Sequence, residues 1–239
     1  MRFSSALAND VPVLVAMHYD VATNARSCAP TAAIESIGQL RPCIPFDARP
    51  MLAALSSQRN QAVAACRLKT YGISVEKEDI LEGTWPVAAL PAGAALLLPL
   101  SPRLGGGVLV AAETSVSLHC DKPADVAIRC SFPAVYFQCF ATVGDDDTRF
   151  LLGDHTGGLH LLTVAHDDDG TVVGLSMRTV GATTCGSAIS YLDSGVCFVG
   201  SRNANSQLIR LLSSPVDDAE PDNFVQVRTL SHGRHSYPV

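Results

Sequence analysis

The sequence predicts an all-β protein built from repeated hairpins. From Ala64 onwards, short apolar runs alternate with clusters of Gly, Asp, Asn, Ser and Pro, which is the pattern of strands joined by turns. Three segments share one template, an apolar strand ending in a small residue, a polar turn and a second apolar strand: Val108–Leu118, Phe150–Leu162 and Cys197–Ile209. Their small residues, Ala111, Gly153 and Gly200, lie 42 and then 47 residues apart. A period of about 40–50 residues is typical of the blades of a β-propeller.

The hairpins are expected in order along the chain. A fourth copy of the template is expected at Val13–Asp20, with its returning strand displaced to Arg67–Tyr71. The predicted blade hairpins therefore fall near residues 11–26 with 64–75, 107–119, 148–165 and 187–213. Gly83–Pro102 is the longest uncharged run, but its four prolines would break a helix, so it predicts two short strands with a turn. A β-sandwich with accidental spacing is the alternative fold.

Residues 27–61 do not fit the repeat. The segment is rich in Ala, Pro and Cys, and we expect it to be a loop insertion within a hairpin, because loops accept extra length cheaply. Its end, Met51–Val63, predicts a short helix with Leu52, Leu55 and Val63 on one side.

The composition excludes several classes of protein. With 47% hydrophobic and 17% charged residues, the chain of 239 residues is not disordered. A net charge of −6 argues against a protein whose main task is to grip phosphate backbones. The eight cysteines form no C-x-x-C pair and no Cys/His finger spacing, so a structural zinc site is not expected. No secretory signal is visible, and we expect a reduced, intracellular, soluble protein without a membrane segment.

The sequence gives little support for a catalytic or metal-binding site. Acidic clusters at 145–147, 167–169 and 217–222 fall in predicted turns, where solvated Asp is ordinary. Asp154, His155, His160 and His166 lie between the first two clusters and suggest a divalent metal, but no metal-binding motif is present. We expect His155 and His160 to be surface or rim residues, and Asp154 and Asp193 to shape turns by accepting bonds from backbone amides. No nucleophile motif or phosphate loop is present either, so no cofactor, metal or catalytic residue is predicted.

Six segments of the chain follow one another in the order found in a known family. The most specific are Phe150–Leu162, Ser190–Arg202 and Ser206–Leu211, and Lys69–Tyr71, Glu82–Trp85 and Gly107–Val110 with Glu113 and Thr114 fit in the same order. They resemble the damage-specific DNA-binding protein 1 family, most closely its plant and algal members. The resemblance covers most of the chain apart from residues 27–61 and the last few. It implies a partial seven-bladed β-propeller of about four blades, each a four-stranded antiparallel sheet. The implied domain is the first of three propellers and spans residues 1–230, with 231–239 as a divergent tail.

The resemblance also implies a function. Members of this family are adaptors of cullin-4 RING ubiquitin ligases, and their first and third propellers hold substrate receptors of WD-repeat type. It implies a nuclear and also cytoplasmic, non-enzymatic scaffold that binds such receptors, meets cullin-4 through a propeller absent from this chain, and reaches damaged DNA only through a partner. The receptor pocket of the family maps onto Gly200, Ser201, Arg202 and Asn203. Asn203 stands where the family usually has an apolar residue, and residues 231–238 lack the family's apolar turn.

Two other functions stay open at this stage. The first is an RNA-processing scaffold similar to splicing factor 3b subunit 3 or to the large subunit of the cleavage and polyadenylation specificity factor, which share the propeller architecture. The second is a propeller hydrolase that would use the Asp/His turns and a divalent metal.

Overall fold

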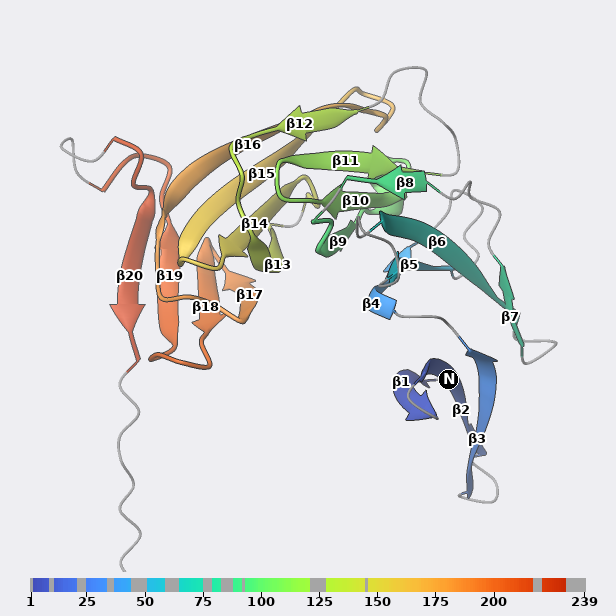
Figure 1. Ribbon diagram of the computed structural model, residues 1–239. Coiled ribbons are helices and arrows are strands. Elements are labelled where there is room, and N and C mark those ends of the chain that lie inside the picture. Colours follow the sequence, from blue (N-terminus) through green and yellow to red (C-terminus); the bar gives the residue numbers. More distant parts are fainter. Residues whose placement is uncertain are drawn as a thin grey trace, which may run out of the picture.

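The computed structural model is almost entirely β-sheet (Figure 1). It describes residues 2–8, 11–20, 25–33, 37–43, 51–58, 65–74, 79–82, 88–91, 93–120, 128–144, 146–216 and 221–230. The strands form five antiparallel sheets, of which three are complete four-stranded meanders. Among the described residues, no helix is long and apolar enough to cross a membrane.

The three meanders occupy the middle and C-terminal parts of the chain. Blade 1 is β9 (Leu96–Pro99), β10 (Val108–Ala111), β11 (Ser115–His119) and β12 (Arg129–Ser131). Blade 2 is β13 (Phe137–Val143), β14 (Arg149–Asp154), β15 (Gly158–His166) and β16 (Val172–Ala182). Blade 3 is β17 (Ala188–Asp193), β18 (Val196–Gly200), β19 (Gln207–Leu211) and β20 (Val225–Thr229). A single 3-10 turn, η1 (Pro102–Leu104), lies between β9 and β10.

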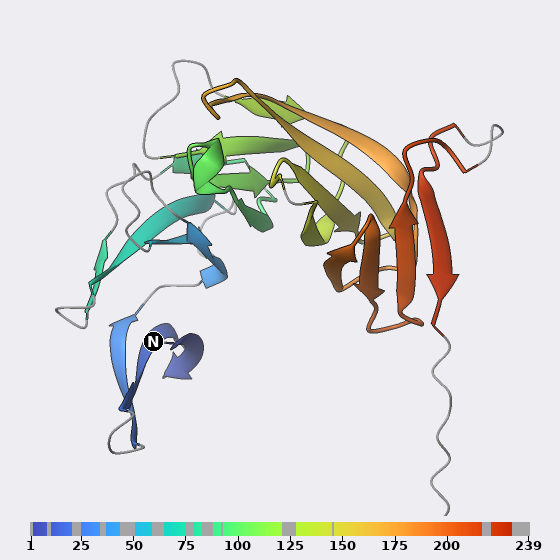
Figure 2. The ribbon, with the colours of Figure 1, turned by 180° about the vertical axis from the view of Figure 1, so that it is seen from behind.

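The blades follow one another along an arc, as both views show (Figures 1 and 2). Their first strands lie side by side, since β9 contacts β13 and β13 contacts β17. Their last strands also meet in order, β12 with β16 and β16 with β20. This is the arrangement of propeller blades around an axis, with the first strand of each blade innermost. The predicted partial β-propeller is therefore confirmed.

The core lies between successive blades. One apolar cluster joins blades 1 and 2 and includes Leu98, Leu109 and Phe150, and a second joins blades 2 and 3 and includes Leu151 and Ile209. Phe150, Leu151 and Leu152 are consecutive in β14 and all are fully buried, because blades cover both faces of this strand. A strand covered on both faces has a continuous apolar run in place of an alternating one. Each such side chain contributes about 1.5–3 kcal/mol by leaving water.

The hairpin predictions hold where the pairing is local. The three template segments form the hairpins β10–β11, β14–β15 and β18–β19, and their turns lie at the predicted positions. The uncharged run contains β8 (Ala88–Leu90) and β9, as expected, although β8 pairs with β6 and β9 with β10.

The first third of the chain corrects the predictions. Strands β1 (Arg2–Ala8), β2 (Val11–Asp20) and β3 (Ala25–Ala33) form one sheet. A second sheet contains β4 (Ile37–Cys43), β5 (Met51–Gln58), β6 (Ala65–Ser74) and β7 (Asp79–Glu82), with β8 on β6. The predicted pairing of 13–20 with 67–71 is wrong, because β2 pairs with β1 and β3 while β6 pairs with β5, β7 and β8.

Residues 27–61 are also not a loop insertion with a short helix, because β3, β4 and β5 run through them. The expected helix at 51–63 is strand β5 up to Gln58, and the rest of that segment lies outside the described residues. β5 pairs with β6 along its whole length and buries Ala53 completely. Ladder bonds to β6 therefore override a local helical pattern. The divergent tail at 231–239 lies outside the described residues.

Five of the cysteines that the structure describes stand outside any disulfide: Cys66, Cys130, Cys139, Cys185 and Cys197. Cys139 and Cys197 are buried between blades 2 and 3, and burial raises the pKa of each thiol to about 11. Thiols in such surroundings act as small apolar side chains.

Candidate functional site

The two ends of the blades carry different loops. Because neighbouring strands are antiparallel, the turns 112–114, 155–157 and 201–206 lie at the same end as the connectors 132–136 and 183–187 that join one blade to the next. We call this end the connector face. The turns at 100–107, 146–148, 167–171 and 194–195 lie at the other end, which we call the acidic face.

The connector face is held together by backbone hydrogen bonds between its hairpin turns and its connectors. Phe132 N donates to Thr114 O (3.0 Å) and Val135 N to Glu113 O (2.8 Å), which ties the first connector to the β10–β11 turn. The bonds that continue across blades 2 and 3 are His155 N to Tyr136 O (2.9 Å), Thr183 N to Gly157 O (2.8 Å) and Ser187 N to Gly200 O (2.8 Å). Each hairpin turn is thus bonded to a connector, so the face is a continuous and preorganised surface.

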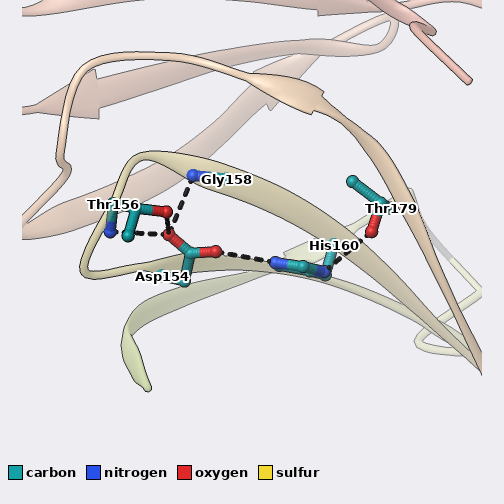
Figure 3. A network of polar contacts seen from close by, with 5 residues as sticks. All are labelled: Asp154, Thr156, Gly158, His160 and Thr179. Carbon is teal, nitrogen blue, oxygen red and sulfur yellow. Dashed lines mark hydrogen bonds and ion pairs between the residues drawn. The ribbon is translucent and has the colours of Figure 1, made fainter. Parts of the chain in front are cut away.

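Asp154 anchors the central turn of this face (Figure 3). One carboxylate oxygen accepts hydrogen bonds from Thr156 N (2.7 Å), Thr156 Oγ1 (2.7 Å) and Gly158 N (2.9 Å). The other oxygen is 2.9 Å from His160 Nε2, and His160 Nδ1 is 3.3 Å from Thr179 Oγ1. The network therefore joins β14, its turn, β15 and β16. The prediction that Asp154 shapes a turn is confirmed, and that for Asp193 stays a prediction.

The electrostatics of Asp154 follow from this arrangement. The side chain is almost fully buried, at 6% exposed, and burial alone would raise the pKa of the carboxyl group. The hydrogen bonds from His160, Thr156 and Gly158 outweigh burial and hold the pKa of Asp154 below its ordinary value. A buried carboxylate that accepts this many bonds stabilises the turn and the strands around it.

Of the four residues considered for a metal site, the structure brings Asp154 and His160 together, without His155 and His166. His160 is buried against Asp154, at 8% exposed, so the expectation of a rim residue is wrong for it. His155 is exposed on the connector face, as expected. His166 ends β15 at the acidic face, where its Nδ1 lies 2.8 Å from Asp167 O. Within the part of the chain that the structure describes, no group of three or more His, Cys, Asp or Glu residues could hold a metal ion.

The predicted partner-binding residues lie on the connector face. Gly200 ends β18, and its carbonyl accepts bonds from both Ser187 N (2.8 Å) and Ser187 Oγ (3.1 Å). Ser201 Oγ accepts a bond from Ala204 N (3.1 Å) and shapes the loop that follows. Arg202 and Asn203 are exposed at its tip. The four residues thus form one surface turn.

Two features of this face were not predicted from the sequence. Gln207 is buried at the start of β19, where its Oε1 accepts bonds from Thr183 Oγ1 and from Thr184 N (3.0 Å), and its Nε2 donates to Thr229 Oγ1 (3.2 Å). A Gln in the apolar strand Gln207–Leu211 is the one local signal for this clamp. Tyr136 and His155 form an exposed edge-to-face pair with ring centroids 6.3 Å apart. No local pattern indicates it, because the two residues come from different turns.

The comparisons with known proteins agree with this architecture. The sequence profile described as the RSE1/DDB1/CPSF1 first beta-propeller matches residues 22–231. The chain belongs to this family. DNA damage-binding protein 1a of Arabidopsis thaliana is 38% identical over 168 residues, which is 70% of this chain and 15% of that protein.

Other plant relatives agree with the first. DNA damage-binding protein 1 of Solanum lycopersicum is 38% identical over 151 residues, and that of Oryza sativa subsp. japonica is 38% identical over 148 residues. The matches cover 63% and 62% of this chain and 13% of each relative. The resemblance read from the hairpin motifs is confirmed. The chain spans about one seventh of the length of these relatives, so their functions as whole proteins come to this chain only as proposals.

Proposed function

We propose that this chain is a non-enzymatic propeller scaffold that binds substrate receptors of cullin-4 ubiquitin ligases through its connector face. The observation that carries the proposal is the continuous, backbone-bonded face that ends in the exposed turn Gly200–Asn203. Membership of a family with relatives named for DNA damage binding supports the same function. The proposed place of action is the nucleus, and also the cytoplasm.

The proposal assigns the contacts to protein partners. Receptors of WD-repeat type would meet the turn 200–203, and cullin-4 would be held by a propeller that lies outside this chain. Damaged DNA would be reached through a receptor. The charge supports this, because net −6 repels a polyanion and the turn has Arg202 as its one cation.

A capture experiment with matched variants tests the proposal. The full chain serves as bait for a purified WD-repeat receptor, and Arg202→Glu is compared with Arg103→Glu, which makes the same charge change in the turn before β10 on the acidic face. We expect Arg202→Glu to weaken capture about tenfold and Arg103→Glu to leave it unchanged, since interface hot spots cost more than about 1 kcal/mol. Equal capture by both variants would contradict the proposal.

The family name also supports an RNA-processing scaffold, because the matched profile groups RSE1 and CPSF1 with DDB1. Mass spectrometry of proteins captured by the full chain separates the two functions. Splicing or cleavage-factor subunits in place of WD-repeat receptors would favour the RNA-processing scaffold. Direct tight binding of UV-irradiated duplex DNA by the chain alone would contradict the assignment of DNA contact to a partner.

A further inference from the structure

Tyr136 is the exposed aromatic side chain of the connector face. It is 49% exposed and is one of five large apolar side chains that are exposed within the described residues. The other four are aliphatic and lie on outer strands or towards the acidic face: Val173, Leu192, Val216 and Val227. Exposed aromatic rings are concentrated at binding hot spots, so Tyr136 differs from the scattered aliphatic side chains.

The position of Tyr136 is fixed before any partner arrives. His155 N donates to Tyr136 O (2.9 Å), and the His155 ring packs edge-to-face against the Tyr136 ring at an interplanar angle of 82°. The turn that carries His155 is itself held by the buried Asp154 network (Figure 3). A side chain that is already ordered costs less entropy when it binds, so this pair is preorganised as an anchor.

The surface continues from Tyr136 to the turn 200–203. Gln138, two residues after Tyr136, places its Oε1 3.4 Å from Cys185 Sγ on the second connector. Ser187 at the end of that connector bonds to Gly200. The aromatic pair and Arg202 are therefore two ends of one stretch of surface.

The charge of this stretch limits its partner. Segments 133–136, 155–157, 183–188 and 201–206 contain no Asp, Glu or Lys, and Arg202 is their one formal charge besides the histidine. A polyanion needs several cations to gain affinity, and these four segments offer a basic partner no carboxylate, since Glu113 lies in the neighbouring 112–114 turn. A segment with an apolar side chain for Tyr136 and a carboxylate for Arg202 is complementary to both ends.

We propose that Tyr136 and His155 form a second anchor on the connector face for an apolar and acidic segment of a protein partner. The inference rests on the proposed function, because it adds a contact to the same face. Tyr136 contributes apolar area, His155 holds the ring in place, and Arg202 selects for negative charge.

Three labelled synthetic peptides of equal length provide the probe: one of Leu and Glu, one of Leu and Lys, and one of Ser and Glu. Fluorescence anisotropy with the full chain measures their binding. The Leu/Glu peptide is expected to bind at least about tenfold more tightly than the other two. Tyr136→Ala should weaken its binding about tenfold, and Tyr136→Phe should retain most of the affinity. Leu192→Ala, which removes an exposed apolar side chain next to the 194–195 turn of the acidic face, is the matched control and should change nothing.

The outcomes separate this inference from the proposed function. Unchanged peptide binding by Tyr136→Ala, equal binding of the Leu/Lys peptide, or an equal loss in Leu192→Ala would overturn the second anchor. If Arg202→Glu abolishes receptor capture while Tyr136→Ala changes neither measurement, the proposed function stands and the second anchor fails. If Tyr136→Ala weakens the peptide while Arg202→Glu leaves receptor capture unchanged, the anchor stands and the receptor assignment fails.

Discussion

The connector face and the acidic face are built from the same hairpins but are held together differently. On the connector face, backbone bonds such as Thr183 N to Gly157 O join a hairpin turn to the connector that leads to the next blade. On the acidic face, Asp167 Oδ1 closes its own turn by accepting bonds from Asp169 N (3.1 Å) and Thr171 N (2.8 Å). The first arrangement makes a continuous surface, and the second makes separate solvated turns.

The two faces also use aspartate differently. Asp154 is buried and bonded to His160, whereas Asp167 is exposed. The acidic turns border an open hollow of about 610 Å3 whose lining includes Arg103, Asp146 and Asp168. Carboxylates in such turns are stabilised by water and by short local bonds. We therefore expect an aspartate's contribution to stability to depend on its burial more than on the number of turn amides from which it accepts bonds.

The largest expected effect is the difference in stability lost when each of the two turn aspartates is replaced in a separate variant. Asp154→Ala leaves His160, Gly158 N and Thr156 without their buried acceptor, and we expect a loss of about 3–4 kcal/mol in the free energy of unfolding. Asp167→Ala removes a similar turn acceptor in water and should cost about 1 kcal/mol or less. Urea unfolding of the two variants measures the difference. Equal losses of unfolding free energy would contradict the expectation that the buried aspartate contributes more.

A pair of glycines gives the next effect. Gly157 has φ +97° and an added Cβ would collide with the carbonyl oxygen of Thr183, whereas Gly105 has φ +77° with open space around it. Gly105→Ala should therefore cost about 1–2 kcal/mol of backbone strain alone. Gly157→Ala adds a clash that breaks the bond from Thr183 to Gly157, so we expect roughly 3 kcal/mol. Thermal unfolding compares the two variants, and hydrogen exchange at the Thr183 amide should rise in Gly157→Ala only.

The smallest expected effect is a change in stability with pH. Because the pKa of Asp154 is lower in the folded than in the unfolded protein, the carboxylate stabilises the fold above its unfolded pKa, near 4. That stability is lost as the pH falls through the folded pKa. The difference in unfolding free energy between the wild type and Asp154→Asn should thus be constant above about pH 5 and shrink below pH 4. A difference that does not shrink in acid would show that Asp154 acts through its shape alone.

Local patterns predict the blades better than the first third of the chain. The hairpins at 108–119, 149–166 and 196–211 join strands a few residues apart, so apolar runs and turn residues specify them. Met51–Gln58 pairs with β6, and that strand also bonds to β7 and β8. The Ala-rich segment Met51–Gln58 has no clear alternation of apolar and polar residues. Its local sequence therefore does not distinguish a strand from a helix.

The candidate site was likewise predictable from the sequence only where neighbouring residues determine it. The turn role of Asp154 follows from its place between an apolar strand and two glycines. The burial of His160 does not, because it depends on the register that pairs Leu152 with His160 and on Thr179 from a third strand. The Tyr136–His155 pair depends on a contact between a connector and a turn. Such contacts are fixed by the packing of blades, and a single sequence does not display them.

The backbone hydrogen bonds across the connector face, from Phe132 to Gly200, join main-chain atoms alone. Their geometry therefore does not depend on the exposed side chains of Tyr136, His155, Arg202 and Asn203, provided that Gly157 and the buried Asp154 network are kept. Selection can replace the exposed side chains one at a time without disturbing the frame beneath them. This separates the evolution of specificity from the evolution of stability, so one propeller frame can be adapted to a succession of different partners.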